Sequence, residues 1–127
     1  MGISEKIYDE LTAEDKKHLH NVTAVCNRLG WGTIIYDDYV SVQNHSPLGE
    51  DISFEISVDT PASDIYMEYE DFDVNWHVEM LIESRGKNGV PDDIKALYED
   101  AEEIEKMLYE LYLETDKVTY WGVNYAE

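Results

Sequence analysis

The chain has little basic charge: 9 Lys and Arg residues stand against 29 Asp and Glu residues, for a formal net charge of −20 over 127 residues. Neutralising nucleic-acid phosphates requires a basic surface, so direct binding to nucleic acid is not expected. An anionic membrane surface would repel the chain for the same reason. A charge this large also opposes compaction, because folding brings like charges closer together. The sequence therefore predicts a partner that is a basic surface or a cation.

Cysteine and long apolar runs are also scarce. Cys26 is the only cysteine, which excludes an internal disulfide and a cysteine-based metal site. No stretch approaches the roughly 20 apolar residues that span a bilayer, and the first residues lack the apolar run of a signal peptide. We expect a cytoplasmic protein that does not enter a membrane.

The acidity does not indicate disorder, because the chain is rich in apolar and aromatic residues. Hydrophobic residues make up 43% of it, with ten Tyr, three Trp and two Phe, whereas disordered acidic segments hold few aromatics. This is enough apolar mass for one core. Trp31, Trp76, Phe54 and Phe72 are expected mostly in that core. With no repeat and no linker, residues 1–127 are predicted to form a single domain.

The first half of the chain predicts a helix followed by strands. Thr12 resembles a helix N-cap answered by Asp15, apolar residues follow at helical spacing, and Gly30 is typical of a helix end, so we expect a helix over 12–29. Apolar and polar residues then alternate over 39–43 and 52–58, after a β-branched run over 32–36. Three antiparallel strands are predicted.

The second half predicts helices. A short helix is expected from a cap at Ser63 or Asp64, and a second from Asp73 or Asn75 to about Gly86. A long last helix is expected from about Pro91, with one apolar stripe: Ile94, Leu97, Tyr98, Ala101, Ile104, Leu108, Leu111 and Tyr112. Residues 118–123 could add a strand or a docked extension. The fold class predicted is α+β: an N-terminal helix, a small antiparallel sheet of about three strands, then C-terminal helices.

Signals of catalysis and of metal binding are weak. Residues 71–75 begin like a calcium-binding EF-hand loop, but Trp76 replaces the required Gly and Ile82 the required Glu. No zinc-binding or phosphate-binding motif is present, and the four His residues and Cys26 have ordinary packing or polar roles as the simplest interpretation. We expect no enzyme, no cofactor and no dedicated metal site. Binding of a stray divalent cation to acids 68–73 stays open.

The acids and tyrosines gather in a way that predicts a binding surface. Residues 50–83 hold eleven acids and no Lys or Arg, and several tyrosines lie between acids. Carboxylates and Tyr together suit an arginine-rich partner, through charged hydrogen bonds and cation–π contacts. The residues predicted to bind the partner are Glu68, Glu70, Asp71, Asp73, Glu99, Glu102, Glu103, Glu110, Tyr69 and Tyr109.

One segment carries a family resemblance. Residues 44–54, which read NHSPLGEDISF, resemble the SPxGEDxxF stretch of small acidic proteins from phages and mobile elements of Firmicutes. Residues 72–80, 86–91 and 97–104 resemble later landmarks of that group, so the similarity covers about residues 20 to 115. The resemblance implies a mobile-element setting, where small acidic proteins are often anti-CRISPR or antirestriction inhibitors.

These observations predict an acidic, protein-binding inhibitor of a host nuclease that acts on nucleic acid. It would act by mimicking DNA or by blocking a basic groove. Helical carboxylates three or four residues apart stand about 5–6 Å from each other, close enough to imitate part of a phosphate track. The alternative is an acidic protein-interaction or divalent-cation-binding module of other purpose.

Overall fold

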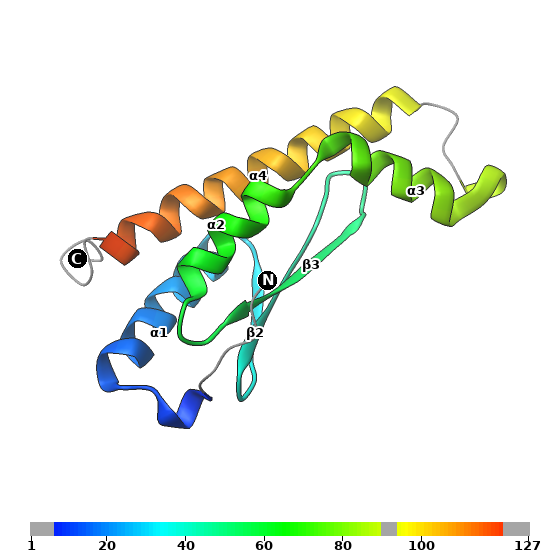
Figure 1. Ribbon diagram of the computed structural model, residues 1–127. Coiled ribbons are helices and arrows are strands. Elements are labelled where there is room, and N and C mark those ends of the chain that lie inside the picture. The colour runs from blue at the N-terminus through cyan, green and yellow to red at the C-terminus, as the bar shows by residue number, and fades with distance from the viewer. Residues whose placement is uncertain (1–6, 90–93, 121–127) are drawn as a thin grey trace.

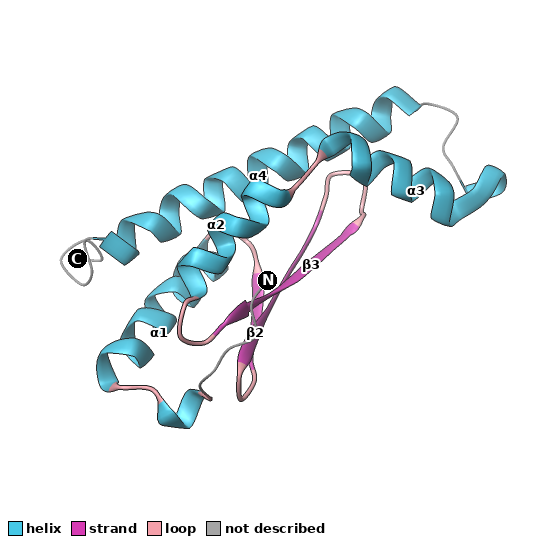
Figure 2. Ribbon diagram, viewed as in Figure 1, coloured by secondary structure: helices cyan, strands magenta, loops and turns pink. Residues whose placement is uncertain are grey.

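A computed structural model describes residues 7–89 and 94–120 and confirms the predicted α+β order (Figure 1). A short 3-10 turn at Tyr8–Glu10 precedes helix α1, three strands follow, and three helices complete the described chain (Figure 2). The bounds are α1 Ala13–Arg28, β1 Gly32–Ile35, β2 Tyr39–His45, β3 Asp51–Ser57, α2 Pro61–Asp71, α3 Val74–Gly89 and α4 Ile94–Tyr120.

The sheet is antiparallel in the order β1-β2-β3 and buries one of its faces. Val40 lies opposite Ile56, and Val42 lies opposite Phe54, and all four are buried in the core with residues from α1, α2 and α4. The residues between them, such as the exposed Glu55, point to the other face. The alternation seen in the sequence therefore separates a helix-covered face from a polar one.

Helix α4 supplies the apolar stripe against which α1, α2 and α3 pack. Its residues Leu97, Ala101, Ile104, Leu108 and Leu111 are almost completely buried, as the spacing predicts. Ile94 departs from the prediction: it is 47% exposed, since it is the first residue of the helix and lies beyond the packed stripe. No helix within the described ranges is long and apolar enough to cross a membrane.

The ends of α1 agree with the prediction, whereas the start of α2 does not. The Thr12 hydroxyl accepts a hydrogen bond from the Asp15 amide at 3.0 Å, and Gly30 adopts a φ of 93° just beyond the helix. Helix α2 begins at Pro61, ahead of the predicted cap. Asp64 is buried instead and accepts a hydrogen bond from the Ser57 amide at 2.6 Å, which joins α2 to the end of β3.

The later helices are longer than predicted. Asp73 caps α3 as expected, because its carboxylate accepts a hydrogen bond from the Trp76 amide at 3.0 Å. Helix α3 continues to Gly89, past the expected end at Gly86. Residues 118–120 belong to α4 rather than to a fourth strand. The predicted position of Pro91 and the rest of the 118–123 tail lie outside the described residues.

The loop between β2 and β3 is fastened to α4 by Asp100. The Ser46 hydroxyl donates to one oxygen of the buried Asp100 carboxylate at 2.6 Å, and the Leu48 amide donates to the other at 3.0 Å. The Ser46 oxygen also accepts from the Glu50 amide at 3.0 Å. Gly49 has a φ of 87°, which favours glycine at this turn. The middle of the segment that carries the family resemblance, residues 46–50, is thus a loop held in place by Asp100.

Replacing Asp100 by Ala is expected to lower the free energy of unfolding by about 1–3 kcal/mol, because it leaves the Ser46 hydroxyl and the Leu48 amide without their charged acceptor. Urea unfolding would measure the loss. Glu99→Ala, one residue away but exposed, is the matched control and should change stability by less than about 0.5 kcal/mol. Equal midpoints for the two variants would show that Asp100 does not stabilise the loop.

Candidate functional site

Helix α2 divides the acids that the sequence places in one cluster. Glu70 interacts with Tyr66 on the side of α2 that faces α4. Glu68 and Asp71 line a pocket on the side that faces β3, and Asp73 lines the same pocket just after the helix. The predicted cluster 68–73 is therefore two surfaces with different surroundings.

The first surface is a group of four tyrosines where α2 meets α4. The rings of Tyr66 and Tyr112 lie 4.9 Å apart, and those of Tyr69 and Tyr109 lie 5.2 Å apart. The rings of Tyr69 and Tyr112 are almost parallel at 5.9 Å. Tyr66 is 40% exposed and Tyr109 is 46% exposed, so the group is open to solvent. The structure thus joins the predicted Tyr69 and Tyr109 and adds a second pair to them.

Carboxylates flank these tyrosines. A hydrogen bond to the Glu70 carboxylate, together with its negative charge, raises the pKa of Tyr66. Glu102 is exposed and precedes Tyr109 by seven residues, about two helical turns, so it lies on the same side of α4. Among the described residues, no ion pair involves Glu70 or Glu102. We call this surface, made of Tyr66, Tyr69, Glu70, Glu102, Tyr109 and Tyr112, the tyrosine face.

The other predicted acids of α4 share their surface with lysines. Glu99, Glu103 and Glu110 are exposed and follow at intervals of four and seven residues, which places them on one side of the helix. Three lysines recur every eleven residues, about three turns, on that same side: Lys95, Lys106 and Lys117. Lys106 forms an ion pair with Glu103 at 3.3 Å. The outer side of α4 is therefore a mixed surface rather than a continuous acidic row.

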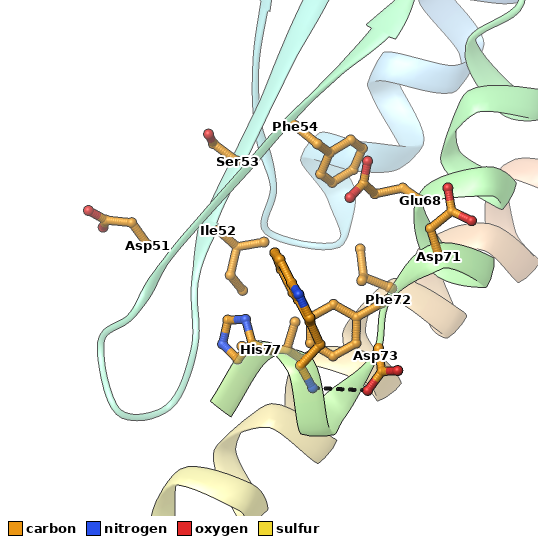
Figure 3. A pocket seen from close by; sticks show the side chains of 12 residues that line it. Asp51, Ile52, Ser53, Phe54, Glu68, Asp71, Phe72, Asp73 and His77 are labelled. Atoms are coloured by element: carbon orange, nitrogen blue, oxygen red, sulfur yellow. Dashed lines mark hydrogen bonds between the residues drawn. The ribbon is translucent and has the colours of Figure 1, made fainter. Parts of the chain in front are cut away.

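The second surface is a pocket of about 310 Å³ between β3 and the junction of α2 and α3 (Figure 3). Ile52 and Phe54 reach into it from β3, whereas Asp51 and Ser53 point away. Glu68 and Asp71 lie beside each other near Phe54. The apolar residues that line the pocket are Ile52, Phe54, Phe72, Ile104 and Leu108. The other side chains at its border are Glu68, Asp71, Asp73, Trp76 and His77.

The position of Trp76 differs from the one expected from the sequence. It was expected in the core with Trp31 and Phe54, which are 3% and 8% exposed, but it is 61% exposed. The reason is its position in the first turn of α3, where the Asp73 cap fixes the backbone while the ring borders the pocket. The sequence held one signal of this exposed position, because Trp76 closely follows the acidic residues 68–73 and lies in the first turn after the cap residue Asp73.

The other candidate groups have structural partners. Burial raises the pKa of the Cys26 thiol to about 12, which fits the expected core residue. His20 and Tyr8 are hydrogen-bonded at 2.8 Å, and His45 contacts Asp51 at 2.9 Å. Within residues 7–89 and 94–120, no three His, Cys, Asp or Glu side chains are grouped so as to hold a metal ion.

The position of Glu68 lowers the stability of the folded state. It is half-buried, and burial first, then the neighbouring Asp71 carboxylate, raise its pKa above the ordinary value for Glu. An acid whose pKa is raised by folding destabilises the folded state wherever it is ionised. Glu68→Gln should therefore increase stability at pH 7, on the order of 0.5 kcal/mol after solvent screening. The gain should shrink as the pH falls through the raised pKa and be absent below the ordinary one.

Thermal unfolding at several pH values would test this expectation. Glu99→Gln is the matched control, because it removes the same charge from an exposed site and reports the effect of net charge alone. A Glu68→Gln gain no larger than the Glu99→Gln gain at pH 7 would mean that the Glu68 position carries no local penalty.

Comparison with known proteins finds no match for the chain among family models, curated proteins or solved structures. The resemblance to acidic phage and mobile-element proteins therefore stays a prediction.

Proposed function

We propose that this protein binds the basic, nucleic-acid-binding surface of another protein and inhibits it by excluding the nucleic acid. The target class suggested by the resemblance is a host nuclease, of the RNA-guided or restriction type. The observation that carries the proposal is the tyrosine face, a solvent-accessible group of four aromatic rings with Glu70 beside Tyr66. Glu102 is exposed on the same side of α4, two helical turns from Tyr109.

The chemistry of this face suits a basic protein. Tyr provides a large, rigid contact area and a hydroxyl, which is why it is enriched at protein interfaces. Arginine, which is well suited to nucleic-acid recognition, also stacks on aromatic rings and forms paired hydrogen bonds with carboxylates. Four rings packed on one another are also preorganised, so less side-chain freedom is lost on binding.

The net charge of −20 supports the same proposal at longer range. A strongly negative protein is steered toward a basic groove, and this accelerates association at low salt. Blocking a groove has more support than close imitation of a phosphate track, because the outer side of α4 alternates Glu with Lys. An acidic interaction module with a target other than a nuclease would use the same face and is the alternative that experiment must separate.

The test is DNA cleavage by a panel of RNA-guided and restriction nucleases, with and without this protein. For a sensitive enzyme, replacing Glu70 and Glu102 by Lys should weaken inhibition by about tenfold or more, since two attractive contacts beside the tyrosine rings would become repulsive. Replacing Glu99 and Glu110 by Lys makes the same charge change on the outer side of α4. That matched control should keep most of the inhibition.

Equal loss in the two double variants would assign the effect to net charge and not to the tyrosine face. A second comparison, Tyr109→Ala against Leu113→Ala, removes an exposed side chain from the tyrosine face or from elsewhere on α4. Only Tyr109→Ala should weaken inhibition. If no nuclease in a broad panel is inhibited, the module alternative replaces the proposal.

A further inference from the structure

The pocket between β3 and the α2–α3 junction is not explained by the tyrosine face, which lies on the other side of α2. Its volume of about 310 Å³ is at the small end of the range of ligand pockets, roughly 300–1,000 Å³. Much of its lining is apolar and includes the buried Ile104 and Leu108 of α4 together with Phe54 and Phe72. An occupant must therefore carry an apolar stem.

The rim of the pocket is acidic. Glu68, Asp71 and Asp73 line it, and no Lys or Arg is among its lining residues. No ion pair between described residues involves any of these three acids. Glu68 and Asp71 lie beside each other as two carboxylates of the same charge, and burial first, then the Asp71 charge, raise the pKa of Glu68. A cation at the rim would relieve that repulsion, so the occupant should be positively charged at its outer end.

The aromatic residues select the kind of cation. Trp76 borders the pocket while 61% exposed, and Phe72 is a second aromatic residue that lines it. A guanidinium group is flat and weakly hydrated, stacks on aromatic rings and can bond two carboxylates at once. An ammonium group is a compact and strongly hydrated charge, so it gains less binding free energy from contact with aromatic rings. An arginine side chain therefore meets all three requirements: an apolar stem for the apolar lining, a positive charge for the acidic rim, and a flat group that stacks on the aromatic residues.

We propose that this pocket binds an arginine side chain, with the aliphatic stem over Phe54 and Phe72 and the guanidinium between Trp76 and the Glu68–Asp71 pair. The assignment rests on the proposed function in one respect: the arginine would belong to the basic partner. The tyrosine face and the pocket would then both contact the partner, one on each side of α2. The pocket would supply the more specific of the two contacts.

The test needs no partner protein. The ¹H–¹⁵N NMR spectrum of the whole chain is recorded during titration with N-acetyl-arginine amide, N-acetyl-lysine amide and N-acetyl-citrulline amide at constant ionic strength. Citrulline has the shape of arginine without its charge. Arginine amide should shift the Trp76 indole signal and the backbone signals of residues 68–77. It should bind several times more tightly than lysine amide, and citrulline amide should leave these signals unchanged.

Replacing Glu68 by Gln and Asp71 by Asn together should weaken arginine binding by about tenfold or more, because two charged acceptors are removed. Glu99→Gln with Glu103→Gln is the matched control and should leave binding unchanged. Loss of binding through unfolding is not expected, because Glu68→Gln relieves repulsion, and the spectrum itself reports the fold. Trp76→Ala should also weaken binding, without changing the net charge.

Three results would overturn the assignment. Arginine and lysine amides could shift the same signals with equal affinity, which would indicate unspecific charge attraction. Mg²⁺ or Ca²⁺ could shift residues 68–77 while arginine amide does not, which would indicate a cation site. Binding could survive the Glu68 and Asp71 replacements. Arginine binding without inhibition of any nuclease would instead reject the proposed function and leave the pocket assignment standing.

Discussion

The burial of one side of α4 is the constraint on which the rest of the structure depends. Leu97, Ala101, Ile104, Leu108 and Leu111 form a single apolar line, and α1, α2 and α3 all pack on that helix. The free energy gained by burying these apolar side chains must offset the mutual repulsion of 29 acids. It also fixes α2 across α4, and that crossing determines which residues share a surface.

The position of α2 explains why acids that are neighbours in the chain have different surroundings. Glu68 and Glu70 are two residues apart, so a helix points them to opposite sides. One therefore meets Asp71 at the pocket, and the other meets Tyr66 at the tyrosine face. A single helix thus turns one acidic run into two surfaces that differ in shape and in aromatic content. The two surfaces are suited to different contacts with one basic partner.

Local patterns in the sequence were sufficient for the elements that depend on neighbouring residues. The Thr12 cap, the Asp73 cap and the alternation of β3 each involve residues within a few positions of one another. The sites depend on longer separations. Asp64 was expected to cap its own helix and instead bonds Ser57, and Asp100 holds Ser46 from 54 positions away. Tyr69 and Tyr109 were predicted singly, but only the crossing of α2 and α4 brings them together.

The apolar contacts of α3 are separate from the main core. Val78 packs with Leu97 and Ala101 in a small cluster, and Figure 1 shows α3 and the first turns of α4 extending beyond the sheet. Asp100 binds the β2–β3 loop at the inner end of this extension. A cluster of that size opens at a lower free energy than the whole domain. Backbone amides of α3 and of α4 before Asp100 should therefore exchange with deuterium sooner than those around Leu108, as a separate cooperative unit.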